Sequence, residues 1–155
     1  MHVSYIVYTN NTVANALILL FKETCDSFGI DFHAKVILSP SFNNIEIFTA
    51  LLNLLENAID AEKEIPEDDR YINLEIILTA RNLSIIVQNR TNQSILQNNA
   101  DLKTTKLQKE LHGYGLRSVR QITQKYNGFV DISKQDNIFS VHMLVAISDS
   151  KYNLQ

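Results

Sequence analysis

The sequence predicts a two-layer α/β sandwich, in which three helices pack on one face of a mixed β-sheet. Apolar residues repeat with helical spacing in three segments and alternate with polar residues in the segments expected to be strands. Strands and helices do not follow one another in strict alternation, which favours a mixed sheet over a purely parallel one. The 155 residues, 45% of them hydrophobic, are enough for one domain with a buried core.

The first part of the chain is expected to alternate between strands and helices. Asn10 and Asn11 can cap a helix that Gly29 ends, because asparagine side chains accept hydrogen bonds from free helix N–H groups. Pro40 closes the next strand, and Pro66 follows the second helix. The expected elements are a strand over residues 3–8, a helix over 12–28, a strand over 31–38 and a helix over 44–63.

The second part of the chain is expected to hold two pairs of adjacent strands and one helix. Asn127 and Gly128 end the helix, and Asp136 lies in the turn of the final hairpin. The expected elements are strands over residues 71–79 and 83–88, a helix over 116–126, and strands over 129–133 and 138–145.

Between these pairs lies a long polar segment, residues 89–112, without a helix or strand pattern. Loops longer than roughly 12–15 residues are uncommon in compact domains and are usually functional or disordered. We expect a lid over about residues 91–111, within a domain spanning residues 10–147. Residues 1–9 are assigned to a remnant of a preceding element, and residues 148–155 to a flexible tail.

Composition excludes several classes of protein. The net charge of -3, with acidic and basic residues mixed, argues against a nucleic-acid partner. Cys25 is the single cysteine and is expected in the core, which fits a reducing compartment. The longest nearly apolar run, residues 13–21, is too short to span a bilayer, and no basic segment typical of a signal peptide precedes it. We expect no membrane contact by this chain.

The helix expected over residues 44–63 carries Asn53 and Asn57 four residues apart, on the face opposite its leucines. Asparagine is a poor residue inside helices, so two on one face need a reason. An amide oxygen can bind Mg²⁺ without adding negative charge beside a triphosphate. The alternative is a solvated face that happens to hold two asparagines.

A second candidate segment, His112 to Leu116, contains Gly113 and Gly115 directly before a helix. Glycines there allow backbone N–H groups to approach an anion, and the helix N-terminus attracts negative charge. The alternative is a flexible connection before the helix, which would contain the same glycines. Lys106, in the expected lid, could reach a phosphate, although lysines on loops are usually only solvated.

The helix segment NLLENAIDA resembles the N box of the GHKL superfamily, which includes DNA gyrase, heat-shock chaperone ATPases, histidine kinases and MutL proteins. The resemblance implies the Bergerat-type ATPase fold, Mg²⁺ bound by Asn57, and ATP contacts by Asp60. Hydrolysing members carry glutamate at the position of Asn53, whereas many histidine kinases carry asparagine there. An amide cannot take a proton from water, which favours transfer to a protein acceptor. Glu56 is then the candidate proton acceptor, and Asn53 a supporting residue of the metal or phosphates.

The glycine segment resembles the G2 box of the same superfamily, GxGL, with Gly113, Gly115 and Leu116 matching. The resemblance implies that this segment, including Tyr114, binds the nucleotide phosphates. Lys106 lies in an element similar to the Ser/Thr-x-Lys often found in the family's lid.

Asn89 ends a strand where the family's G1 box carries Asp-x-Gly, whose aspartate accepts a hydrogen bond from the adenine amino group. Asn89 could accept the same bond through its carbonyl oxygen. No glycine lies between Gly29 and Gly113, so the G1 glycines are absent. This departure resembles the accessory-gene-regulator type of peptide-sensing kinases. The resemblance to the superfamily covers about residues 9–145.

The resemblance implies the ATP-binding catalytic domain of a two-component sensor histidine kinase. Such a domain transfers the γ-phosphoryl group of Mg-ATP to a histidine on a separate dimerisation domain, and serves a response regulator indirectly. It would be the cytoplasmic domain of a membrane-anchored receptor. The alternatives are a degenerate nucleotide-binding or interaction module, which the missing G1 glycines favour, and an anti-sigma-type serine kinase. His2, followed by Val3 in a strand-like run, is not assigned as the phosphate acceptor.

Overall fold

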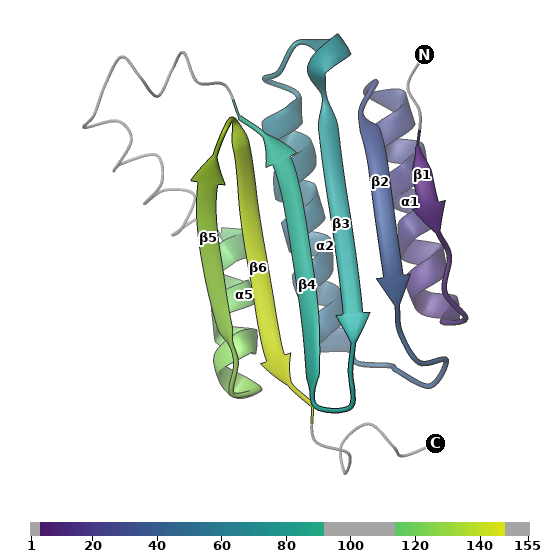
Figure 1. Ribbon diagram of the computed structural model, residues 1–155, viewed down its shortest axis with the longest axis vertical. Coiled ribbons are helices and arrows are strands. Elements are labelled where there is room, and N and C mark those ends of the chain that lie inside the picture. The colour runs from purple at the N-terminus through teal and green to yellow at the C-terminus, as the bar shows by residue number, and fades with distance from the viewer. Residues whose placement is uncertain (1–3, 92–113, 148–155) are drawn as a thin grey trace, which may run out of the picture.

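A computed structural model describes residues 4–91 and 114–147 of the chain. Six strands form one sheet in the order β1-β2-β3-β4-β6-β5 (Figure 1). The pairs β1–β2 and β2–β3 are parallel, and the remaining pairs are antiparallel, so the sheet is mixed as predicted. The strands are β1 (Tyr5–Val7), β2 (Asp31–Ile37), β3 (Tyr71–Leu78), β4 (Asn82–Arg90), β5 (Phe129–Gln135) and β6 (Ile138–Ala146).

Three helices cover one face of this sheet, behind the strands in Figure 1. They are α1 (Thr12–Ser27), α2 (Ile45–Glu62) and α5 (Tyr114–Lys125), and a short 3-10 helix, η1 (Glu67–Asp69), joins α2 to β3. The predicted two-layer α/β sandwich is therefore confirmed. Because β2 and β3 are parallel, the chain has to cross the sheet between them, and α2 is that crossover.

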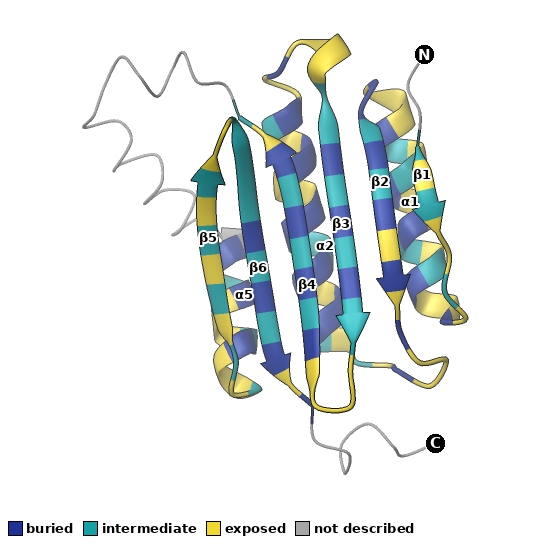
Figure 2. Cartoon of the chain, viewed as in Figure 1, coloured by how far each residue is buried: buried dark blue, intermediate teal, exposed yellow. Residues whose placement is uncertain are grey.

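The hydrophobic core lies between the sheet and the helix layer. Alternate residues of β3 and β4 are buried against the helices, as the dark bands of Figure 2 show. The buried face of α2 meets them with Leu51, Leu55 and Ala58, each at most 3% exposed. Burying a leucine or isoleucine side chain contributes roughly 1.5–3 kcal/mol, so the central strands and α2 supply much of the stabilisation. The central buried residues of the strands are Ile72, Leu74, Ile76, Leu83, Ile85 and Val87.

The predicted cap of α1 is present at Asn11. The side-chain oxygen of Asn11 accepts from the N–H of Ala14 at 2.9 Å. Its amide nitrogen donates to the carbonyl oxygens of Ser39 and Phe42, at 3.0 and 2.7 Å. Asn11 is 1% exposed, so these bonds compensate for the burial of its amide. The cap thereby ties the start of α1 to the segment that leads into α2.

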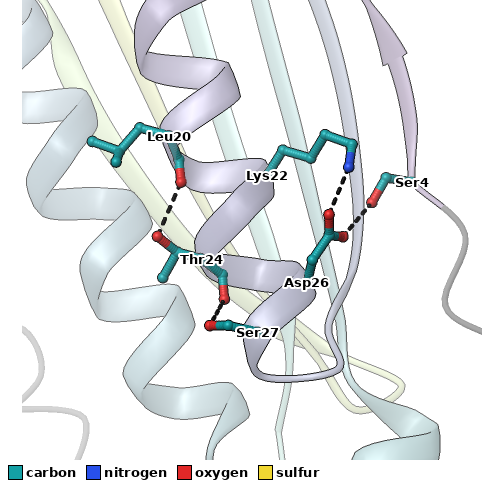
Figure 3. Close-up of polar contacts among 6 residues, drawn as sticks. All are labelled: Ser4, Leu20, Lys22, Thr24, Asp26 and Ser27. Carbon is teal, nitrogen blue, oxygen red and sulfur yellow. Dashed lines mark hydrogen bonds and ion pairs between the residues drawn. The ribbon is translucent and has the colours of Figure 1, made fainter.

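The C-terminal end of α1 contacts the edge of the sheet through exposed polar groups (Figure 3). Lys22 pairs with Asp26 at 2.6 Å, and the Ser4 hydroxyl donates to Asp26 at 3.4 Å. Exposed contacts of this kind contribute little to stability, because water screens them. Residues 5–7 nevertheless join the sheet as edge strand β1, paired with β2. A domain boundary near residue 9 stays a prediction.

Several element boundaries differ from the predicted ones. The third helix begins at Tyr114 and not at Leu116, so Tyr114 and Gly115 belong to the helix itself. Strand β4 extends to Arg90 because its backbone pairs with β6 as far as Ile138. Side-chain periodicity did not show this pairing. The expected lid from residue 92 onward and the expected tail, residues 148–155, lie outside the described residues.

Cys25 is a core residue, as predicted, and is 1% exposed. Burial, reinforced by the negative charges of Asp26 and Glu62, raises the pKa of its thiol to about 12. The thiol therefore stays protonated and packs as a small apolar group.

Truncating a side chain on the buried face of α2 should lower the free energy of unfolding more than an equal truncation on the surface. Leu55 is 1% exposed and Leu20 is 54% exposed. We expect Leu55→Ala to lower the free energy of unfolding by about 2–5 kcal/mol, through lost burial and the cavity left behind. Leu20→Ala, the control, should change it by less than about 1 kcal/mol. Urea unfolding measures both, and equal losses would contradict the assignment of α2 to the core.

Candidate functional site

The polar face of α2 runs along the outside of the helix layer. Its N-cap, Asn44, accepts from the N–H of Ile47 at 3.1 Å, which fixes where the helix starts. Asn53 is half-buried, and Asn57, one turn later, is exposed. The predicted polar face is thus confirmed as a surface of α2.

Helix α5 packs beside this face and runs antiparallel to α2. Lys125, at the end of α5, pairs with Glu46 in the first turn of α2, at 2.5 Å. The amide nitrogen of Asn53 lies 3.5 Å from the Ser118 hydroxyl oxygen, nearer the start of α5. One further turn carries α2 to Asn57 and α5 back to its own N-terminus, so these two lie at the same end of the helix pair. The arrangement places a helix N-terminus, with its unpaired N–H groups, on the side of Asn57.

A second contact fixes the other end of the helix pair. The amide nitrogen of Asn44 donates to the Tyr126 hydroxyl at 3.0 Å. Leu116 and Val119 of α5 are buried, at 4% and 0% exposed, and anchor the helix to the core. The position of the α5 N-terminus relative to α2 is therefore set by apolar packing, with polar contacts along the seam.

Asn89 lies near the end of β4 and faces the helix layer, in the same alternation as Ile85 and Val87. It is 4% exposed, and its amide nitrogen donates to the carbonyl oxygen of Arg90 at 2.8 Å. A buried asparagine at the end of an otherwise apolar strand face is unusual, because burying an amide costs free energy unless it is hydrogen-bonded.

Glu62, which the sequence analysis did not select, closes the same end of the structure. It is the last residue of α2 and is 0% exposed. Its carboxylate accepts from the backbone N–H of Tyr71 at 3.0 Å and from that of Arg90 through a shorter contact. The helical spacing from Leu55, Ala58 and Ile59 places residue 62 on the buried arc, so the sequence pattern could have predicted that Glu62 is buried.

The remaining predicted residues are distributed as follows. Glu56 and Asp60 are exposed on α2, and Asp60 pairs with Lys63 at 3.0 Å. Tyr114 and Gly115 open α5. Lys106 and Gly113 lie outside the described residues. The structure therefore brings Asn53, Asn57 and the start of α5 together, with Asn89 at the end of the neighbouring strand.

The donor set of α2 suits Mg²⁺ bound together with a nucleotide. Magnesium takes few protein ligands at nucleotide sites, usually one or two oxygens, and the rest come from phosphates and water. The exposed Asn57 amide can supply one such oxygen. Within residues 4–91 and 114–147, no group of three or more His, Cys, Asp or Glu side chains could hold a metal ion. The described residues thus offer Mg²⁺ the amide oxygen of Asn57, which is exposed on α2.

Comparison with known proteins identifies the family. The GHKL domain family matches residues 42–146, which is more than half of the chain. The chain therefore belongs to the GHKL domain family. No curated protein sequence matches it significantly.

Solved structures show the same fold in histidine kinases. The catalytic domain of histidine kinase ThkA, in a nucleotide-free form, aligns with a TM-score of 0.61 and 19% identity, over 85% of this chain and 89% of that one. Histidine kinase AdeS of Acinetobacter baumannii aligns with a TM-score of 0.63 and 14% identity, over 96% and 70%. The mycobacterial sensor histidine kinase MprB aligns with a TM-score of 0.54 and 14% identity, over 86% and 95%. The chain thus has the fold of histidine kinase catalytic domains.

The lengths and apolar character of the helices show whether any of them could span a membrane. Among the residues that the structure describes, no helix combines the length and the apolar character that crossing a membrane requires.

The buried carboxyl of Glu62 should make stability depend on pH. Burial, opposed by the Tyr71 and Arg90 N–H groups, raises its pKa from 4.5 to about 7. Between these pH values the folded chain holds a proton that the unfolded chain has released, so this group's contribution to stability falls as pH rises. Glu62→Gln cannot titrate. The free energy of unfolding of the original chain minus that of Glu62→Gln should therefore decrease from about pH 4.5 to about pH 7. Urea unfolding across this range measures the difference, and a constant value would contradict the raised pKa.

Proposed function

We propose that this chain is the ATP-binding catalytic domain of a two-component sensor histidine kinase. It transfers the γ-phosphoryl group of Mg-ATP to a histidine on a separate dimerisation domain. The observation that carries the proposal is the pairing of the Asn53–Asn57 face of α2 with the N-terminus of α5, in a chain of the GHKL family. Phosphoryl transfer asks mainly for positioning and electrostatic stabilisation, which this arrangement can supply.

In the proposed site, Asn57 offers its amide oxygen to Mg²⁺, and Asn53 supports the metal or the phosphates. Bound Mg²⁺ neutralises part of the charge on the phosphates. The first N–H groups of α5, from Tyr114 and Gly115, are proposed to bind the phosphates, because helix N-termini attract anions. Gly113 and Lys106, outside the described residues, are proposed phosphate contacts on the family's pattern.

The same residues favour transfer over hydrolysis. Asn53 matches the position at which hydrolysing members of the superfamily carry a glutamate as general base, and a neutral amide does not take up a proton. Glu56, exposed on α2, is the proposed acceptor of the proton that the attacking imidazole releases. The imidazole nitrogen of the partner histidine forms the new bond to phosphorus, and ADP leaves. Asp60 is proposed to contribute to nucleotide binding from the same helix face.

Asn89 is the proposed adenine contact. With its amide nitrogen donated to Arg90, its carbonyl oxygen remains the acceptor for the adenine amino group. The absent G1 glycines and the asparagine one residue before the end of β4 support assignment to the accessory-gene-regulator type of peptide-sensing kinases.

The proposed partner is the dimerisation and phosphotransfer domain of the same kinase, because the chain has the fold of histidine kinase catalytic domains. A response regulator would receive the phosphoryl group from that domain. We place the chain in the cytoplasm, as the catalytic domain of a membrane-anchored receptor.

Nucleotide binding is the first requirement of this proposal. The 155-residue chain should bind ATP weakly, with a dissociation constant between about 1 μM and about 1 mM, and Mg²⁺ should strengthen the binding. Isothermal calorimetry with and without Mg²⁺ measures both effects. No heat at millimolar ATP with Mg²⁺ would reject the proposed function.

Replacing the proposed metal ligand should abolish transfer while leaving the fold intact. Asn57→Ala removes the oxygen, and Asn57→Asp adds a negative charge beside the triphosphate. Both variants should transfer at least about 100-fold less radiolabel from ATP to a separately supplied cognate histidine hairpin. Both should keep the circular dichroism of the original chain, because Asn57 is exposed.

Asn82→Ala is the matched control for this experiment, since Asn82 is exposed at the opposite end of β4 from Asn89. It should transfer normally. Normal transfer by Asn57→Ala would refute the metal assignment. An original chain that binds Mg-ATP but transfers nothing to the hairpin would identify a degenerate nucleotide-binding module.

A further inference from the structure

Glu62 occupies a position that is unfavourable for a carboxylate. It is 0% exposed, and it is the last residue of α2, where the helix dipole places partial negative charge. An ionised group is rarely buried unless it is paired or hydrogen-bonded. Its presence at this position therefore calls for specific partners, and the structure provides them.

The partners are two backbone N–H groups at the end of the β3–β4 pair. The carboxylate accepts from Tyr71, the first residue of β3, at 3.0 Å, and from Arg90, the last residue of β4. The ladder between these strands reaches Ile72 opposite Asn89, so the carboxylate bonds the next residue on each strand. One side chain thus ties the end of α2 to the ends of two strands.

This contact fixes the backbone that follows Asn89. The N–H that Arg90 donates to Glu62 belongs to the peptide group that follows Asn89. The carbonyl oxygen of Arg90 accepts from the Asn89 amide nitrogen at 2.8 Å. Glu62 therefore holds in place the residue that orients the Asn89 amide.

Orientation matters because an asparagine amide is a donor at one end and an acceptor at the other. An aspartate at this position could only accept, whereas an asparagine that turns over presents its NH₂ group. Adenine carries an amino donor at the position where guanine carries a carbonyl acceptor. An Asn89 amide that turns freely could satisfy either base. One whose nitrogen is held by Arg90 offers an acceptor, which suits adenine alone.

We propose that Glu62 is a positioning residue for base recognition, which holds Arg90 and through it the Asn89 amide so that the nucleotide site selects adenine over guanine. The inference rests on the proposed function, because it assumes that Asn89 faces the base.

Protonation of Glu62 should weaken this positioning. A carboxylate accepts at both oxygens, whereas a carboxylic acid uses one oxygen as a donor and loses one of the two backbone contacts. The pKa of Glu62 is raised to about 7 by burial, against the Tyr71 and Arg90 N–H groups and the charges of Arg90 and Arg70. The negative charge of Glu62 in turn helps to raise the pKa of the Cys25 thiol of α1, which stays protonated. Adenine selectivity should therefore increase as the pH rises through the pKa of Glu62, about 7.

The test compares Mg-ATP with Mg-GTP on the 155-residue chain, by calorimetry or by displacement of a fluorescent nucleotide. The original chain should prefer ATP. Glu62→Gln should reduce that preference about tenfold, because one lost hydrogen bond to a positioned group is of this order. Glu64→Gln, the same change at an exposed position two residues later, is the matched control and should keep the preference. Circular dichroism confirms that each variant is folded.

Two further measurements separate positioning from a loss of structure. From about pH 6 to about pH 8, the preference of the original chain for ATP should rise, and that of Glu62→Gln should stay constant. Asn89→Ala should lose the preference, and adding Glu62→Gln to it should cause no further loss, because both act through one amide.

Each outcome bears on a different claim. If the original chain binds neither nucleotide, the proposed function fails, and the inference fails with it. If it binds Mg-ATP but shows no preference over Mg-GTP, or if folded Glu62→Gln keeps the full preference, only the inference fails. If Glu62→Gln does not fold, the pH profile of the original chain decides, and a preference that does not change with pH overturns the inference.

Discussion

The packing of α2 against the sheet and beside α5 (Figure 1) is the constraint on which the rest of the structure depends. The helix buries Leu51, Leu55 and Ala58 against β3 and β4, and this burial fixes which of its faces remains outside. The face left outside carries Asn53 and Asn57, so the core determines the position of the candidate site. The polar contacts of α2 with α5, at 2.5 and 3.5 Å, refine an arrangement that apolar packing already imposes.

The two ends of the candidate site are held by different physical means. At the proposed phosphate end, α5 presents its N-terminus because Leu116 and Val119 are buried beneath it. At the proposed base end, the buried carboxylate of Glu62 accepts from backbone N–H groups of two strands. The first arrangement is apolar and insensitive to pH, whereas the second depends on a group whose pKa is raised to about 7. One end of the candidate site is thus held by contacts that do not change with pH, and the other end by a carboxyl group whose protonation does.

The sequence predicted the fold because the periodicity of its elements is strong and its glycines and prolines fall at their ends. It also predicted the Asn53–Asn57 face, since residues four apart on a helix share one side. Glu62 was missed because a glutamate near a helix end normally reads as solvated, and its partners are backbone groups that leave no trace in residue type. The start of α5 was placed at Leu116, two residues late, because helix boundaries depend on backbone hydrogen bonds.

The attachment of α2 at both of its ends has a consequence for how this chain tolerates change in length. Asn44 joins its start to Tyr126, and Glu62 joins its end to the sheet, so the number of residues between the two is fixed by the distance they span. Inserting or deleting one residue there would turn every later side chain by about 100° around the helix axis. Asn57 would then leave the side of α5, or Glu62 would leave the strands. Substitutions on the outer surface of α2 do not rotate the later side chains in this way. Residues of this helix can therefore change in identity, but their number cannot change.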